Sequence, residues 1–255
     1  MKESEIREIL DAIHETDKPE NLEKAYSERK KAYGNGDCLG LDEMSAIATI
    51  MACKSLEYKS GNQRNHKKVE QAVLYLEEVR KALKESRTNR EMLFWPQALI
   101  STYPVLVLCY IELAEWEKAD NILNEYIRHL INLFDRVQIP EPLNVDAVAD
   151  RLYHIIEIVC SRYRSSGDTK RAINRMLSAS RIILKYGDER TQAKFYAYLT
   201  KMYRSAGNVR KAEESYKEFE ENYKCAVSGG NIPDDITNLY DELDFDQLGL
   251  AGATA

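Results

Sequence analysis

Two arginines occupy matching places in a motif that occurs twice in the chain. The stretch "RYRSSGDTKRA" starts at Arg162 and "MYRSAGNVRKA" starts at Met202, so that Arg164 matches Arg204. A guanidinium group binds carboxylate and phosphate groups through two parallel hydrogen bonds. If the two copies fold alike, one acidic group could contact both arginines. The alternative, that both arginines are solvated surface charges, stays open.

A second set of side chains has the types that bind metals. In "HIIEIVC", His154, Glu157 and Cys160 follow one another at three-residue steps. Such steps drift around a helix, and no second histidine stands at a recognisable ligand spacing, so we expect no metal site. The chain also lacks a paired Glu-x-x-His motif, a glycine-rich phosphate loop, G-x-S-x-G and H-E-x-x-H. We therefore expect no cofactor and no enzymatic activity, with a catalytic site dispersed across helices as a minor alternative.

Composition is that of a soluble protein. The chain has 255 residues, of which 44% are hydrophobic and 31% are charged. No stretch approaches ~20 uninterrupted apolar residues, so no membrane span is expected. The N-terminal residues lack the apolar core of a signal peptide. Five cysteines at scattered spacings do not indicate a disulfide framework, which predicts a cytoplasmic location.

Charge is distributed unevenly along the chain. The whole chain holds 36 Lys and Arg against 42 Asp and Glu, for a net charge of −6. Residues 231–255 contain six acidic residues and no Lys or Arg, so the first 230 residues hold 36 of each and are formally neutral. A body without basic excess is not expected to bind nucleic acid directly.

Hydrophobic periodicity predicts an all-α protein of ten or eleven helices. The run "VLVLCYI" at 105–111 is compatible with a buried strand, but the helical pattern continues through Leu113 and Trp116 and favours a helix. An Asn at 144 is placed to cap the helix that follows it. Helices are predicted near 6–13, 17–33, 41–60, 66–86, 90–114, 117–136, 144–166, 169–186, 189–206 and 209–228.

Three segments align on one alanine each, Ala119, Ala172 and Ala212. Each segment has a large aliphatic residue thirteen positions before its alanine and a tyrosine nine positions before it. Each also has a small residue five positions before the alanine. The small residues are Ala114, Gly167 and Gly207. This pattern predicts helical hairpins in which a small residue ends the first helix and the alanine lets the two backbones approach closely. Such hairpins must stack to bury their apolar faces.

The aligned segments resemble the tetratricopeptide repeat (TPR) family over about residues 100–130, 153–185 and 193–225, best in "YLTKMYRSAGNVRKAEESYKEF". The alanines are 53 and 40 residues apart, against a family period of ~34. The resemblance implies a TPR-like α–α superhelix forming a single domain over 1–255. Within it, residues 1–90 would be degenerate N-terminal helices, 91–230 TPR-like hairpins, and 231–255 an acidic capping helix and tail.

A second resemblance concerns the C-terminal part. The stretch "AGNVRKAEESYKEFEENYKCAVSGGNIPDDITNLYDEL" is similar to the close of the bacterial transcriptional activator domain, where a "P-x-x-x-x-x-LY" helix follows the last hairpin, here from Pro233 to Tyr240. The resemblance implies a regulatory domain that acts on or with a DNA-binding partner. Nothing at the N-terminus resembles the winged-helix domain that usually accompanies such domains.

In the TPR family the first helix of each hairpin lines a concave groove, and the groove usually binds the ligand. Projected onto this chain, the groove residues are His154, Glu157, Ser161, Arg164, Ser165, Lys194, Lys201, Arg204 and Ser205. Five of these nine are Arg, Lys or His, so we expect a basic groove. The family's Lys/Asn carboxylate clamp is not intact, because Lys201 and Ser161 stand where clamp asparagines would be. The predicted function is a scaffold that binds an acidic or carboxylate-bearing protein or peptide.

The acidic tail allows two interpretations. Ile236, Leu239, Tyr240 and Leu243 form an apolar stripe at helical spacing. The stripe could cap the exposed end of the helical stack, as repeat proteins require. Alternatively, the tail could reach the basic groove as an internal pseudo-ligand, or enter the groove of a neighbouring molecule in a homo-oligomer.

Overall fold

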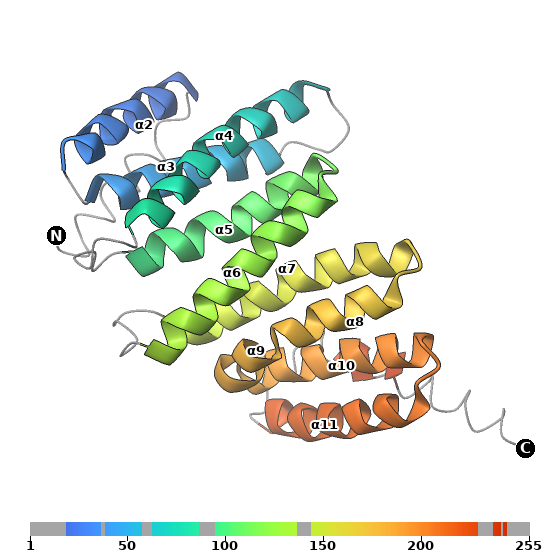
Figure 1. The fold of residues 1–255 in the computed structure, drawn as a ribbon. Coiled ribbons are helices and arrows are strands. Elements are labelled where there is room, and N and C mark those ends of the chain that lie inside the picture. Colours follow the sequence, from blue (N-terminus) through green and yellow to red (C-terminus); the bar gives the residue numbers. More distant parts are fainter. Residues whose placement is uncertain are drawn as a thin grey trace, which may run out of the picture. The chain divides into compact units, whose positions relative to one another are not determined.

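The computed structural model describes residues 19–36, 39–57, 63–86, 95–136, 144–228, 237–240 and 242–243. All regular structure in these ranges is helical, with ten longer helices, α2 to α11, and no strand (Figure 1). The all-α fold class is therefore confirmed. The helix predicted near 6–13 lies outside the described residues. None of the described helices has the combination of length and hydropathy that a bilayer span requires.

The chain divides into two compact units, residues 1–129 and 130–255, with the division inside α6. The prediction of one domain over the whole chain stays a prediction. The first unit contains α2 (Pro19–Gly34), α3 (Leu39–Glu57), α4 (Gln63–Ser86), α5 (Trp95–Glu112) and the part of α6 (Trp116–Arg136) up to residue 129. The second unit contains the rest of α6 and then α7 (Val145–Ser165), α8 (Thr169–Ser178), α9 (Ser180–Tyr186), α10 (Glu189–Ser205) and α11 (Val209–Val227).

In the first unit, α3 packs against α2, α4 and α5, and α4 packs against α5. The run 105–111 lies within α5, as its helical interpretation predicted, and Pro104 lies inside the same helix. In the second unit, α10 packs against α11 and also against α7, α8 and α9. Consecutive antiparallel helices therefore account for most of the core in each unit, as expected for helical hairpins.

The three aligned hairpins end their first helices in the same way. Ala114, Gly167 and Gly207 have φ angles of 58°, 83° and 69°, in the left-handed region. The N–H that follows each of them donates to the carbonyl of the aligned tyrosine, at 2.8 Å to Tyr110, 2.8 Å to Tyr163 and 2.9 Å to Tyr203. This is the Schellman arrangement, which satisfies carbonyls at a helix end and reverses the chain direction. Only Ala114 adopts it with a side chain.

The aligned alanines and the matched residues on the helix faces are buried in all three hairpins, whereas the small residues at the hairpin ends, Ala114, Gly167 and Gly207, are exposed. The alanines 119, 172 and 212 are 1%, 0% and 4% exposed, so each allows close contact between its two helices. The matched residues thirteen and nine positions before each alanine, and four and seven positions after it, are also buried. They are Leu106, Tyr110, Leu123 and Tyr126 in the first hairpin, Val159, Tyr163, Met176 and Ala179 in the second, and Leu199, Tyr203, Tyr216 and Phe219 in the third.

One predicted helix is divided in two. The sequence predicted a single helix over 169–186, but α8 ends at Ser178 and α9 begins at Ser180. At Ala179 the N–H donates to the carbonyl of Met176, three residues back, at 3.1 Å. The hydroxyls of Ser178 and Ser180 donate to the carbonyls of Arg175 and Leu177 at 2.6 and 2.8 Å. Serine hydroxyls that take up helix carbonyls in this way bend or interrupt a helix.

A polar network joins α4, α5 and α6 around Glu125. Its carboxylate accepts hydrogen bonds from the Tyr103 hydroxyl, from Arg80 Nη1 at 2.8 Å and from Lys84 Nζ at 2.9 Å. The buried ring of His129 places Nε2 at 3.1 Å from the Tyr103 hydroxyl. Burial alone would raise the pKa of Glu125, but the bonds from Tyr103 and Lys84 and the charge of Arg80 outweigh it and lower the pKa to about 2.

Substitution of the left-handed glycines tests the hairpin ends. Gly167→Ala and Gly207→Ala should each lower the free energy of unfolding by about 1 kcal/mol, since a Cβ strains the left-handed backbone. No neighbouring atom lies within 4 Å of either added Cβ, so the cost is conformational. Gly34→Ala is the matched control because its added Cβ also meets nothing and its φ is ordinary. Equal changes in the free energy of unfolding for Gly34→Ala and Gly167→Ala, measured by urea titration, would contradict the left-handed backbone at Gly167.

The Glu125 network predicts a loss of stability in acid. The carboxylate titrates near pH 2 in the folded chain against an ordinary 4.5, so its contribution is complete above about pH 4.5 and lost as the pH falls toward 2. The loss is on the order of 2–3 kcal/mol. Glu125→Gln should remove this pH dependence, measured as unfolding free energy against pH. Glu85→Gln, which breaks an exposed pair with Lys81, should change stability by less than about 1 kcal/mol.

Candidate functional site

The predicted groove residues lie on α7 and α10, the first helices of the two hairpins of the second unit. Both helices have side-chain caps. Asn144 Oδ1 accepts the N–H of Ala147 at 3.0 Å, as the sequence predicted, and Asp188 Oδ1 accepts the N–H of Thr191 at 2.8 Å. Each cap satisfies a backbone donor that the first turn leaves unpaired. The caps therefore set where the two helices begin, and so which side chains share a face.

At the start of the predicted groove, His154 is exposed between two carboxylates. Its Nε2 is 3.5 Å from Asp150 and its Nδ1 is 3.8 Å from Glu157. Cys160 is buried, and its thiol donates to the carbonyl of Ala172 at 3.2 Å. His154, Glu157 and Cys160 are therefore not gathered at one point. In the part of the chain that the structure describes, no group of three His, Cys, Asp or Glu side chains is arranged to hold a metal ion.

Further along α7, Ser161 and Arg164 meet a tyrosine of α10. The hydroxyls of Ser161 and Tyr198 are 2.8 Å apart, and Arg164 Cζ lies 5.5 Å from the centre of the Tyr198 ring. Burial raises the pKa of Tyr198, and the bonds from Ser161 and Arg164 oppose the shift. The guanidinium group is partly exposed. The arrangement holds a cation over an aromatic face, a contact that fixes the position of the arginine.

The other predicted residues differ in exposure. Ser165 and Ser205 are exposed, and each hydroxyl donates to the carbonyl four residues back, that of Ser161 or Lys201, at 2.9 Å. Lys194 is only 7% exposed, unlike the other eight predicted groove residues. The two serines occupy equivalent places, as the alignment predicted.

Two predicted groove residues contact the C-terminal segment, which we define as residues 237–240 and 242–243. Lys201 Nζ forms an ion pair with the carboxylate of Glu242. Arg204 Nη1 donates to the carbonyl oxygen of Leu243 at 3.2 Å, and its Cζ lies 5.7 Å from the Tyr216 ring centre. A basic patch of α10 thus holds an acidic segment of the same chain.

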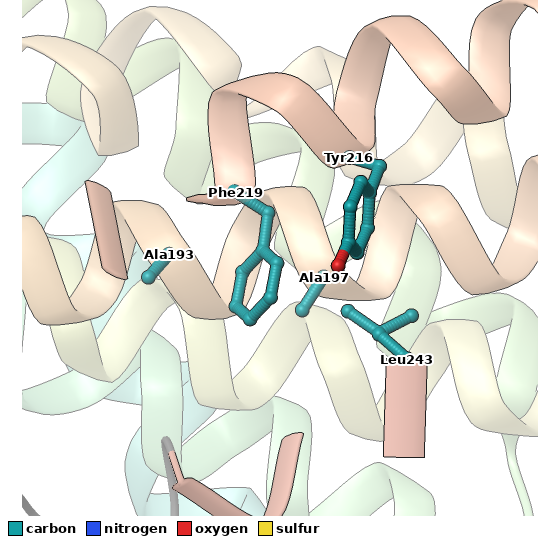
Figure 2. Close-up of a cluster of buried hydrophobic side chains, with 5 residues drawn as sticks. All are labelled: Ala193, Ala197, Tyr216, Phe219 and Leu243. Carbon is teal, nitrogen blue, oxygen red and sulfur yellow. The ribbon is translucent and has the colours of Figure 1, made fainter. Parts of the chain in front are cut away.

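The C-terminal segment also fills an apolar cluster on the last hairpin. Leu243 is fully buried among Ala193 and Ala197 of α10 and Tyr216 and Phe219 of α11. Figure 2 shows its side chain pointing toward Ala197 and Tyr216. The segment therefore makes the apolar contacts expected of a cap together with polar contacts to the predicted groove residues. Ile236, the first residue of the predicted stripe, lies outside the described residues.

The sequence projection missed Tyr198 and the aromatic residues that receive the segment. Tyr198 continues the stripe of Lys194, Lys201 and Ser205 at helical spacing, so the same periodicity contained the signal. Together these side chains offer hydrogen-bond donors and positive charge beside aromatic surface. Such a surface suits a carboxylate-bearing chain segment.

Comparison with known proteins gives a limited result. No protein-family model matches the chain, and no curated protein sequence matches it. A solved structure, the crystal structure of BtubC (BKLC) from P. vanneervenii, aligns with 84% of this chain and 91% of that chain, at 16% sequence identity and a TM-score of 0.41.

Proposed function

We propose that the protein is a non-enzymatic scaffold whose second unit binds an acidic or carboxylate-bearing segment of a partner protein on the surface of α7 and α10. One observation carries the proposal. Lys201 and Arg204, both predicted from the sequence to line a groove, bind the carboxylate of Glu242 and the carbonyl of Leu243. A surface that accepts an acidic segment of its own chain has the chemistry to accept one from a partner.

The proposed architecture is a TPR-like superhelix of helical hairpins. Support comes from the left-handed ends at Ala114, Gly167 and Gly207 and from the burial of the aligned alanines and of the matched residues on the helix faces in all three hairpins. The first helix of each hairpin would then line the concave face. Under this proposal the protein is cytoplasmic and acts through protein contacts, without direct binding of nucleic acid or membranes.

Arg164 lies on α7, whereas Lys201 and Arg204, which hold the C-terminal segment, lie on α10. It lies partly exposed over Tyr198, beside the exposed Ser161. A carboxylate of a partner could accept hydrogen bonds from the guanidinium group. Because the Tyr198 ring restricts the arginine, less conformational entropy is lost on binding than for an unrestrained side chain.

The alternative proposal is a regulatory domain of the bacterial transcriptional activator type. It depends on the segment from Pro233 to Tyr240 after the last hairpin. Leu239 and Tyr240 pack against the α10–α11 cluster, but a capping segment of any helical repeat would do the same. The scaffold proposal therefore takes precedence.

Charge reversal at Arg164 tests the scaffold proposal. Arg164→Glu should abolish capture of partner proteins from a lysate of the source organism, because an acidic ligand would meet a like charge. Arg151→Glu is the matched control, since Arg151 is an exposed residue of the same helix outside the predicted groove. Captured proteins are identified by mass spectrometry, and circular dichroism checks that both variants are folded.

Partners that wild type and folded Arg164→Glu capture equally would contradict the proposed surface. Partners lost equally with Arg164→Glu and Arg151→Glu would show that overall charge, and not this site, controls the capture.

A further inference from the structure

The C-terminal segment presents three side chains in a fixed order, aromatic, acidic and aliphatic. Tyr240 stacks on Tyr223 of α11, with ring centres 4.5 Å apart and planes at 22°, and lies 6.1 Å from the Phe219 ring. Glu242 is paired with Lys201. Leu243 is fully buried. Each of the three therefore has its own receiving residues on α10 and α11.

Neighbouring turns of α10 contact the acidic and the aliphatic residue of the C-terminal segment. Ala193 and Ala197 are one helical turn apart on α10, and both are fully buried in the cluster that contains Leu243. Of the two, Ala197 is the one that lies near the Leu243 side chain (Figure 2). Lys201 is one turn further along α10, on the same side as Ala197, and its partner Glu242 directly precedes Leu243 in the chain. A larger residue at 197 would fill part of the space that the leucine occupies.

Arg204 adds a contact that does not depend on the ligand's sequence. It donates to the backbone carbonyl of Leu243 at 3.2 Å, so any residue at this place would satisfy it. The bond fixes the register of the bound segment, while Tyr223, Lys201 and Ala197 select side chains. Backbone contacts that position a ligand, together with side-chain contacts that select it, are typical of peptide recognition.

We propose that this surface of α10 and α11 is a binding site for partner segments with the order aromatic–any–acidic–aliphatic, and that residues 240–243, Tyr-Asp-Glu-Leu, occupy it as an internal competitor. The proposal rests on the proposed function, since it names the ligand class and the regulation of the same basic surface. A partner binds by replacing the C-terminal segment. The charge of the segment fits, because Glu242 lies in a stretch of six acidic residues without a basic one.

Competition within one chain lowers the apparent affinity for an outside ligand. A tethered segment acts at an effective concentration that reaches the millimolar range for short linkers. The contacts that hold the segment include a buried leucine, the partly buried Leu239, a stacked tyrosine, an ion pair whose glutamate is 62% exposed, and a hydrogen bond to a carbonyl. Weakening any of these contacts should release the site and raise the affinity of a separate peptide.

The test is a fluorescence anisotropy titration of full-length protein with a fluorescein-labelled synthetic peptide, IPDDITNLYDELDF, which carries residues 232–245. Leu243→Asp in the protein should raise peptide affinity about 10-fold or more over wild type, and Glu242→Ala about 3-fold, because the internal segment competes less and an exposed ion pair adds only a small part of its binding. Adding Lys201→Glu to Glu242→Ala should reverse the gain. A peptide with Asp in place of the second leucine should not bind.

Asn238→Lys is the matched control for charge. Asn238 is an exposed residue of the same segment, and its substitution by lysine raises the net charge by one, as Glu242→Ala does. It should leave peptide affinity near the wild-type value. An equal gain with Asn238→Lys would show that general attraction of an acidic peptide explains the result, and would overturn the proposal.

Other outcomes are also decisive. Equal affinity of wild type, Leu243→Asp and Glu242→Ala would overturn internal competition, and no binding by the folded variants would overturn the site. If Leu243→Asp unfolds, Glu242→Ala decides, because Glu242 is largely exposed. A wild-type dimer in light scattering that dissociates in the Glu242→Ala variant would assign the segment to a second copy and overturn the proposal. None of these outcomes decides the capture experiment with Arg164→Glu, which remains a separate test of the scaffold function.

Discussion

A helical hairpin buries only one side of each of its helices, and the need to cover the other side is the constraint on which this structure depends. In the second unit, part of the surface of α10 is covered because α10 packs against α7 and α8. The remaining apolar surface of α10 and α11 is covered by Leu239, Tyr240 and Leu243. The last hairpin is thus completed by a few residues rather than by another hairpin.

Because the C-terminal segment carries the acidic Glu242 beside these apolar residues, the proposed binding surface would serve both stability and recognition. Leu243 removes apolar atoms from water, which is the larger favourable effect, whereas the exposed pair of Lys201 and Glu242 adds little free energy. The pair instead restricts which segment fits, since an apolar segment would leave Lys201 without a carboxylate. Stability thus comes mainly from the leucine, and selectivity from the lysine.

Much of the fold could be predicted from the sequence because its contacts are local. Helical period located the longer helices, and the alignment on three alanines located the left-handed ends, including the one at Ala114. The break at Ala179 was missed because the apolar pattern continues through it, and the serine hydroxyls on either side interrupt the helix.

The burial of Lys194 was missed because a helical projection assigns a side chain to a face of the helix without knowing which neighbouring element covers that face. The sequence allowed the tail as a groove ligand but did not identify the pair of Glu242 and Lys201, which are 41 residues apart. That pair depends on where the chain folds back onto α10, and helical periodicity carries no information about such a return.

The position of the covering residues in the chain has a consequence for biosynthesis. Translation proceeds from the N-terminus at roughly 5–20 residues per second, so α10 and α11 are made before Leu243. The cluster of Tyr216 and Phe219 therefore gains its leucine only when one of the last described residues has been made, so this part of the core is completed late in synthesis.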